Sequence, residues 1–251
     1  MALINLKIFS EELGMQTAVN IVIPQKNTNG EIGVSSNVGD GRLKCLYLLH
    51  GLSDDNTIWM RRTSIERYAT EYGICVVMPD GARSFYSDMK YGMNYYSYIA
   101  KELPQIIEDM FNVSSSREDR YIGGLSMGGY GAMKIALEEQ GRYAAAFGLS
   151  PVADIKNENF TETLIPVFGD SIPDEADLFY LTTKHNMDKT KPRLYVTIGK
   201  DDFMYNDSVR LNEHLKNLNY DYTYVETPGS HSWELWDKTV QEALKWIFKG
   251  V

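Results

Sequence analysis

The segment that most constrains the fold is a glycine-rich connection, YIGGLSMGGYGAMK, which runs from Tyr121 to Lys134. It contains the pattern G-x-S-x-G, with Ser126 at its centre between Gly124 and Gly128. An apolar run leads into the pattern and helix-forming residues follow it, so the segment predicts a strand that turns sharply into a helix. Small residues on both sides of the serine allow the chain to fold back without clashes. Ser126 is therefore a candidate nucleophile; a tight turn with an incidental serine is the alternative.

Strand-like and helix-like segments alternate along most of the chain. Apolar runs such as LKCLYLLHG, ICVVMPDG, YAAAFGLS and RLYVTIG are typical of strands that are covered on both faces. Helical patterns lie between them: one ends at Gly73, and another contains Pro104, which predicts a kink or break. This alternation predicts an α/β fold with a mainly parallel central sheet and helices on both faces.

The 251 residues fit one domain that spans residues 1–251. Residues 151–192 interrupt the alternation, because they contain no clear strand and only two short helical patterns. We interpret them as a short insertion after the sixth strand that forms either a cap over a ligand crevice or a pair of surface helices. The polar, glycine-rich stretch from Gln25 to Arg42 predicts a hairpin loop rather than a domain boundary.

Composition excludes several classes of function. The net charge of −9 argues against nucleic acid and anionic membranes as partners, while 43% hydrophobic residues are enough for a sizeable core. Cys45 and Cys75 lie in apolar runs and are interpreted as buried free thiols. The start of the chain lacks the features of a signal peptide, and no apolar run reaches membrane-spanning length, so we expect a cytoplasmic protein. The sequence leaves open whether copies of the chain form a homo-oligomer.

A serine nucleophile needs a base, and the base needs an acid that orients it. After a strand–turn–helix nucleophile, these partners are expected in the order acid, then histidine, on loops that follow later strands. His231, in PGSHSW before the last helix, fits the base, whereas His185 and His214 are interpreted as surface residues. Asp201 and Asp202 both follow the RLYVTIG strand, and their spacing does not choose between them.

The same chemistry requires two backbone N–H groups that stabilise an oxyanion. Met127, the residue after the serine, supplies one candidate. Leu52 supplies the other, since it lies in the HGLS loop directly after the CLYLL strand. We interpret His50, which precedes Ser126 in the chain, as a residue that braces this loop by hydrogen bonds. The glycines match neither a phosphate-binding loop nor a dinucleotide fingerprint.

Four separate motifs resemble the esterase D/putative esterase family of α/β-hydrolases. They are HGL at His50, GLSMGGYGA at Gly124, GKDDF at Gly199 and GSHSWELW at Gly229. The resemblance spans nearly the whole chain and implies the α/β-hydrolase fold. That family includes tributyrin and acetyl esterases, S-formylglutathione hydrolases, and feruloyl and acetyl-xylan esterases.

The resemblance also assigns roles to residues. It implies Ser126 as nucleophile, His231 as base, and Asp202 rather than Asp201 as acid. It places the oxyanion donors at Leu52 and Met127, and it requires neither a metal nor an organic cofactor.

The expected function is a serine carboxylesterase that hydrolyses short-chain acyl esters of the acetyl or butyryl type, with a small-molecule ester as substrate. Trp233 and Tyr130 are candidate substrate-binding neighbours of the site, whereas Phe203 and Met204 are interpreted as packing residues. Three alternatives remain: a feruloyl or acetyl-xylan esterase, an S-formylglutathione thioester hydrolase, and a non-catalytic carbohydrate-binding relative.

Overall fold

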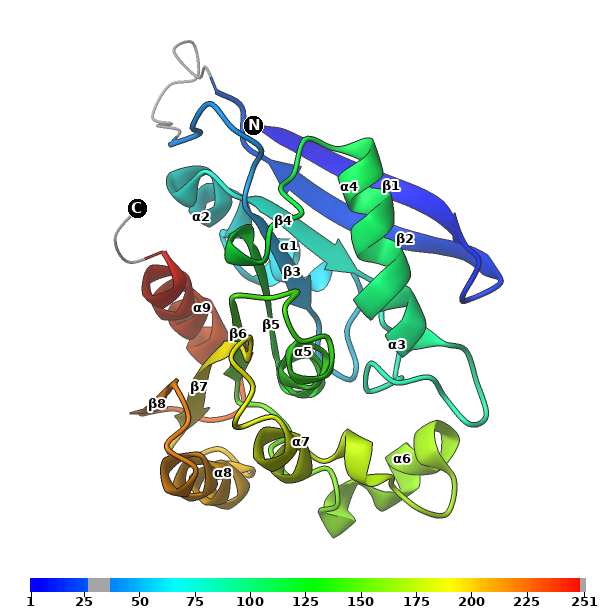
Figure 1. Ribbon diagram of the computed structural model, residues 1–251, viewed down its shortest axis with the longest axis vertical. Helices are drawn as coiled ribbons and strands as arrows, with labels where there is room; N and C mark the ends of the chain where they lie inside the picture. Colours follow the sequence, from blue (N-terminus) through cyan, green and yellow to red (C-terminus); the bar gives the residue numbers. More distant parts are fainter. Residues whose placement is uncertain (27–36, 249–251) are drawn as a thin grey trace.

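The computed structural model describes residues 1–26 and 37–248. Their strands form one eight-stranded sheet in the order β1-β2-β4-β3-β5-β6-β7-β8 (Figure 1). β1 and β2 form an antiparallel hairpin, β2 also pairs antiparallel with β4, and the remaining pairs are parallel. The strands are β1 (Ala2–Ser10), β2 (Met15–Ile23), β3 (Cys45–Leu49), β4 (Cys75–Pro79), β5 (Arg120–Leu125), β6 (Ala145–Leu149), β7 (Arg193–Gly199) and β8 (Tyr222–Thr227).

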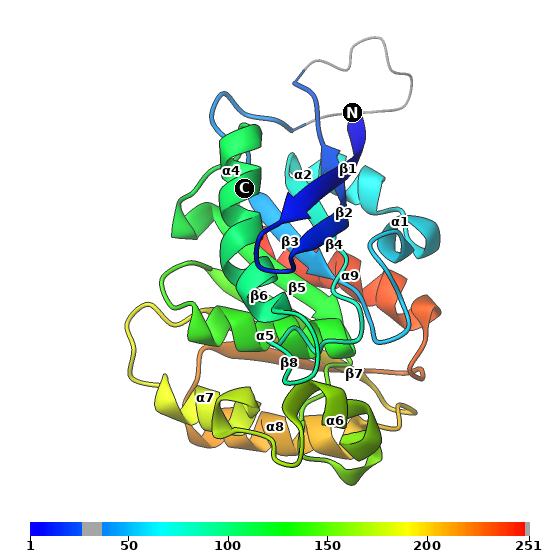
Figure 2. The ribbon, with the colours of Figure 1, turned by 90° about the vertical axis from the view of Figure 1, so that its right-hand side faces the viewer.

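Helices cover both faces of the sheet. On one face lie α4 and α5, with α8 nearby; on the other lie α1, α2 and α9 (Figures 1 and 2). The α-helices are α1 (Ile58–Arg62), α2 (Ile65–Tyr72), α3 (Tyr95–Ser97), α4 (Leu103–Met110), α5 (Met127–Glu138), α6 (Thr161–Phe168), α7 (Leu178–Lys184), α8 (Tyr205–Asn217) and α9 (Trp233–Ile247). Shorter helical turns are the π-turn η1 (Tyr98–Glu102) and the 3₁₀ turns η2 (Arg117–Asp119), η3 (Glu158–Phe160) and η4 (Asp174–Ala176).

The central strands are buried on both faces, which is why they are apolar throughout. In β3, Tyr47 and Leu49 belong to the core under α4 and α5, whereas Leu46 and Leu48 belong to the core under α1, α2 and α9. Successive side chains of a strand point to opposite faces, so one short apolar run supplies both cores. The carboxyl ends of β3, β5, β6 and β7 therefore meet at one rigid edge, where loops can present functional groups.

The prediction that residues Gln25 to Arg42 form a hairpin loop is wrong, because the strands on either side of this segment are not neighbours in the sheet. The segment connects β2 to β3, and β4 lies between these two strands in the sheet. Residues 27–36 of this loop lie outside the described residues. The hairpin of this region is formed instead by β1 and β2, whose connection ends at Gly14 with φ of 63°. Strand pairing depends on distant segments, which local turn signals do not reveal.

The helix stop at Gly73 is confirmed, because this residue ends α2 in the left-handed conformation with φ of 63°. The helical segment around Pro104 is interrupted differently from a simple kink. The π-turn η1 directly precedes α4, and Pro104 sits in the first turn of α4. Proline has no N–H to donate, and the wide π-turn directly before it accommodates the hydrogen bond that is missing from the helix.

Residues 151–192 join β6 to β7 and contain η3, α6, η4 and α7. α7 packs between α5 and α8, which fixes this part of the insertion to the main body of helices (Figure 2). Whether the insertion caps a ligand stays a prediction. Within residues 1–26 and 37–248, none of the helices combines the length and apolar character needed to cross a bilayer.

Cys45 and Cys75 face each other in register on the neighbouring strands β3 and β4. Both are buried free thiols, as the sequence predicted. A hydrogen bond between the two sulfur groups, together with burial, raises the pKa of Cys75 well above its ordinary value. Both side chains therefore contribute to the core as small apolar groups.

Candidate active site

Ser126 occupies the sharp turn between β5 and α5, with φ of 52° and ψ of −119°. A positive φ is costly for a residue with a Cβ atom and persists only where the surroundings enforce it. Here the Ser126 N–H donates to the Leu149 carbonyl at 2.9 Å, and its own carbonyl accepts from Tyr130 N–H at 3.0 Å. The strained serine is thus held at the carboxyl edge of the sheet, as expected for a nucleophile elbow.

The two glycines of the pattern are required by close backbone contacts. A Cβ atom on Gly124 would lie 2.6 Å from the Leu49 carbonyl oxygen, and one on Gly128 would lie 2.4 Å from the same oxygen. Either side chain would force β3 away from the turn. This packing explains why the sequence signal at Ser126 is specific: the glycines are needed by the approach of β3, not only by the turn itself.

A chain of hydrogen bonds connects the serine to a histidine and an aspartate. His231 Nε2 lies 3.1 Å from Ser126 Oγ, and His231 Nδ1 lies 2.8 Å from Asp202 Oδ2. An ionised carboxylate only accepts hydrogen bonds, so Nδ1 carries the proton and Nε2 is free to accept the serine hydroxyl. Asp202 follows β7 and His231 precedes α9, so the three groups come from separate loops at the same edge.

Of the two adjacent aspartates, the structure places Asp202 next to the histidine. The Asp202 side chain is completely buried, and its second oxygen accepts from Met204 N–H at 3.0 Å. Asp201 is exposed, and its backbone N–H donates to the Gly229 carbonyl. The backbone of Asp201 therefore helps to join the loops that follow β7 and β8, and its side chain lies at the surface.

The environment keeps Asp202 ionised. Burial alone would raise the pKa of this carboxyl, but the hydrogen bonds with His231 and with Met204 N–H outweigh it and lower the pKa below its ordinary value. A charged Asp202 can hold the imidazole of His231 in one tautomer and stabilise the imidazolium that forms when His231 takes a proton.

The predicted oxyanion donors lie on adjacent strand ends. β3, which leads to Leu52, pairs in parallel with β5, which leads to Met127. Met127 is the first residue of α5, and N–H groups in a first helical turn have no intrahelical acceptor. In the described part of the chain, Leu52 N–H also has no hydrogen-bond acceptor. Both N–H groups are therefore available to an external acceptor.

Aromatic side chains surround His231. The Trp236 ring meets the imidazole edge-on with centroids 4.7 Å apart, and Trp233 packs against both Trp236 and Trp59. Trp233 is partly buried beside the site, and its contact with substrate stays a prediction. Tyr130 is fully buried and donates its hydroxyl to the Ala176 carbonyl at 2.7 Å, so it fastens α5 to the insertion. Its ring presents no surface to a ligand.

Phe203 differs from the packing role that the sequence suggested. Its side chain is 67% exposed, and its ring lies over the imidazole of His231 with centroids 4.9 Å apart. The turn that directs Asp202 inward turns the next side chain outward, whereas Met204 is buried as expected. The only indication in the sequence that Phe203 lies near the site was its position directly after Asp202.

The other histidines lie in different surroundings. His214 is not simply solvated: its Nε2 lies 3.1 Å from the Phe179 carbonyl oxygen and joins α8 to α7. The surface interpretation of His214 is therefore wrong, because the insertion covers that face of α8. His185 interacts with Asp188, its neighbour in the insertion. His50 is buried beneath the loop that leads to Leu52.

Comparison with known proteins identifies the family. The model of the family described as "Putative esterase" matches residues 10–247. The chain belongs to this esterase family. An acetyl esterase from Caldicellulosiruptor saccharolyticus is 29% identical over 265 residues, which cover 99% of each chain.

Two solved structures from Staphylococcus aureus are also similar. The fluorophosphonate-binding serine hydrolase FphF is 35% identical with a TM-score of 0.86, and the S-formylglutathione hydrolase FrmB is 36% identical with a TM-score of 0.85. Each comparison covers 98% of both chains. The predicted α/β-hydrolase fold is confirmed, and the chain is a carboxylic ester hydrolase of the serine hydrolase type.

Proposed function

We propose that this esterase hydrolyses short-chain acyl esters through Ser126, His231 and Asp202. The observation that carries the proposal is the unbroken hydrogen-bond chain from Ser126 Oγ through His231 to the buried Asp202 carboxylate, with distances of 3.1 Å and 2.8 Å. A strained serine at a helix N-terminus, beside a base with an oriented tautomer, has the parts that acyl transfer requires. The full-length similarity to an acetyl esterase supports a small acyl group.

The reaction proceeds through an acyl-enzyme. Ser126 Oγ attacks the ester carbonyl carbon while its proton passes to His231 Nε2. The carbonyl oxygen becomes an oxyanion, which accepts hydrogen bonds from Leu52 and Met127 N–H groups. The C–O bond to the leaving group then breaks, and His231 returns the proton to the departing alcohol.

Water completes the cycle. It attacks the acyl-serine carbonyl while His231 again accepts a proton, and collapse of the second tetrahedral intermediate returns that proton to Ser126 Oγ. The products are the carboxylic acid and the free enzyme. Asp202 stabilises the imidazolium in both halves of the reaction.

Thioester hydrolysis is the second candidate. FrmB, described as an S-formylglutathione hydrolase, is 36% identical over nearly the whole chain. The same three residues would act, but the leaving group would be a thiolate that needs less help from a general acid. The ratio of kcat/KM for an ester and for a thioester that carry the same acyl group therefore separates the two candidates.

A substrate panel tests the proposal. It contains aryl and alkyl acetates, butyrate and octanoate esters, methyl ferulate, acetylated xylan and S-formylglutathione, each assayed with the wild type and Ser126→Ala. We expect the highest kcat/KM with acetyl or butyryl esters and loss of turnover in Ser126→Ala. Higher kcat/KM with the glutathione thioester would favour the second candidate, and retained turnover in Ser126→Ala would refute the nucleophile.

A further inference from the structure

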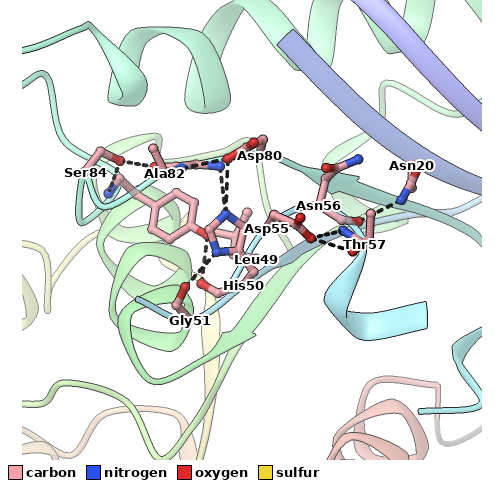
Figure 3. Close-up of polar contacts among 12 residues, drawn as sticks. Asn20, Leu49, His50, Gly51, Asp55, Asn56, Thr57, Asp80, Ala82 and Ser84 are labelled. Carbon is pink, nitrogen blue, oxygen red and sulfur yellow. Dashed lines mark hydrogen bonds and ion pairs between the residues drawn. The ribbon is translucent and has the colours of Figure 1, made fainter. Parts of the chain in front are cut away.

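His50 is a buried histidine that the proposed reaction does not use. It follows β3 directly, and only 1% of its surface is exposed. Three polar contacts hold it (Figure 3): Nδ1 lies 2.7 Å from the Gly51 carbonyl oxygen, Nε2 lies 2.8 Å from Gly81 N, and the His50 carbonyl accepts from the Tyr86 hydroxyl at 2.9 Å. These contacts join the end of β3 to the loop that follows β4.

The contacts determine the tautomer of His50. A backbone N–H can only donate, so the Nε2 atom that meets Gly81 N–H must be unprotonated. The single proton of the neutral imidazole is then on Nδ1, which donates to the Gly51 carbonyl. Asp80 Oδ1 lies 3.7 Å from Nε2, beyond hydrogen-bonding distance, and accepts instead from Ala82 N–H at 2.9 Å. The geometry therefore fits a neutral His50.

The Gly51 carbonyl belongs to the same peptide group as the Leu52 N–H. A trans peptide is planar, and its C=O and N–H point in opposite directions. A hydrogen bond that fixes the carbonyl therefore also fixes the direction of the Leu52 N–H. The Gly51 carbonyl accepts a second hydrogen bond from Asp54 N–H at 3.2 Å. Two donors on one carbonyl polarise the peptide and strengthen its N–H as a donor.

The same peptide lies beside the nucleophile turn. A Cβ atom on Gly51 would lie 2.7 Å from Cδ1 of Leu125, the residue immediately before Ser126. The far end of the loop is anchored separately, because Asn20 donates to the Asn56 carbonyl and Asp55 accepts from Thr57 (Figure 3). Hydrogen bonds thus anchor the loop at both ends, and His50 provides the anchor next to Ser126.

We propose that His50 is a positioning residue for the oxyanion hole. Through Nδ1–H it orients and polarises the Gly51–Leu52 peptide, so that Leu52 N–H donates to the oxyanion of the tetrahedral intermediate. The Nε2 contact with Gly81 keeps the proton on Nδ1. The inference rests on the proposed function, because it assigns a supporting residue to the same reaction.

Two substitutions separate the two ring nitrogens. In His50→Asn the side-chain amide can occupy the position of Nδ1 and donate to the Gly51 carbonyl. In His50→Gln the longer side chain places its amide at the position of Nε2. There it can accept from Gly81 N–H, but it cannot reach the Gly51 carbonyl. We expect His50→Gln to lower kcat by about 10- to 100-fold with little change in KM, short of the loss from deleting an oxyanion donor. His50→Asn should recover most of that loss.

The affinity for a trifluoromethyl ketone provides the decisive readout, because its adduct with serine carries an oxyanion. Its inhibition constant should rise in His50→Gln by the same factor as kcat/KM falls. Tyr220→Phe is the matched control, since it removes a buried tyrosine hydrogen bond to the Pro192 carbonyl that makes no contact with His50 or the Gly51–Leu52 peptide. We expect this control to keep its affinity for the ketone.

Equal losses in His50→Asn and His50→Gln, or an unchanged ketone affinity in both, would overturn the inference. Wild-type turnover and its loss in Ser126→Ala report on the proposed function separately. A second measurement does not depend on activity: nitrogen-15 NMR of the imidazole, assigned by comparison with His50→Asn, should show a protonated Nδ1. A protonated Nε2 would contradict the proposal whatever the kinetics of the variants.

Discussion

Two histidines, each near an aspartate, lie at the same edge of the sheet and differ in what they can do. His231 Nδ1 is 2.8 Å from a fully buried Asp202 carboxylate, and its Nε2 reaches a serine hydroxyl. His50 Nε2 is 3.7 Å from a partly exposed Asp80 and accepts a backbone N–H instead. The first arrangement leaves one ring nitrogen for chemistry, whereas the second uses both nitrogens to hold backbone. The surroundings of each histidine therefore decide whether it can act as a base or only as a brace, meaning a residue that holds the loop after β3 in place.

The largest expected effect distinguishes these two histidines directly. His231→Ala should lower kcat for an aryl acetate by about 10⁴-fold or more, as should Ser126→Ala, because members of a triad act as a unit. The double variant should lose little more than either single variant. Steady-state kinetics with the same ester measures all three. If His231→Ala and the His50 variants lost activity equally, the distinction between base and brace would fail.

The next effect concerns the aspartate beside the base. Asp202→Asn should lower kcat by about 10³- to 10⁴-fold, because an amide no longer selects the Nδ1–H tautomer of His231. Asp201→Asn, one residue away and exposed, is the matched control and should stay within about twofold of the wild type. Kinetics above neutral pH checks both variants. Comparable losses at the two positions would remove Asp202 from the proposed triad.

These results bear on how much of the molecule is readable from the sequence. The nucleophile turn was predictable, because Gly124 and Gly128 record a backbone approach that no other residue permits. Spacing did not choose between Asp201 and Asp202, since both follow the same strand; the family resemblance implied Asp202, and the fold shows that its side chain turns inward. The position of β2 beside β4 was missed because it depends on contacts between distant segments. Aromatic composition likewise did not show that Phe203 is exposed over the imidazole.

A smaller effect is expected at Phe203, whose exposed ring lies beside the imidazole of His231. In the proposed reaction the leaving alcohol takes its proton from His231 Nε2, and the Phe203 ring is 4.9 Å from that imidazole and mostly exposed. Phe203→Ala should lower kcat/KM for phenyl acetate by about 3- to 10-fold, the value of one aromatic contact. Methyl acetate should change by less than about twofold.

Deacylation provides the control for this variant, because phenyl and methyl acetate form the same acyl-enzyme. Its rate, measured after a rapid burst of product, should be unchanged in Phe203→Ala. An equal loss with both acetates, or a slower deacylation step, would show that Phe203 acts on the base rather than on the leaving group.

The last expected effect is on stability rather than on catalysis, and it concerns Lys134. This buried amine on α5 donates to Ser87, in the loop that also carries Gly81 and Tyr86. Burial lowers the pKa of Lys134 to about 8, against the attraction of Glu138 and Asp88. Between that value and its ordinary value of 10.5 the unfolded chain holds the extra proton, so the free energy of unfolding should rise with pH.

Lys134→Met removes this group and keeps most of its apolar length. The difference in unfolding free energy between wild type and variant should shift in favour of the wild type by about 2 kcal/mol as the pH rises from about 8 to about 10.5. Urea unfolding at several pH values measures the shift. A difference that does not change with pH would show that Lys134 is not deprotonated in the folded protein.

The most direct test of the account is covalent labelling of the nucleophile. A fluorophosphonate should phosphonylate Ser126 Oγ with release of fluoride, because a serine activated by His231 attacks the phosphorus as it would attack an ester carbonyl. Mass spectrometry of the intact protein should show one adduct per chain, and peptide mapping should place it on Ser126. Labelling should disappear in Ser126→Ala and slow strongly in His231→Ala. An adduct on another residue, or unchanged labelling in Ser126→Ala, would contradict the assignment of Ser126 as the nucleophile.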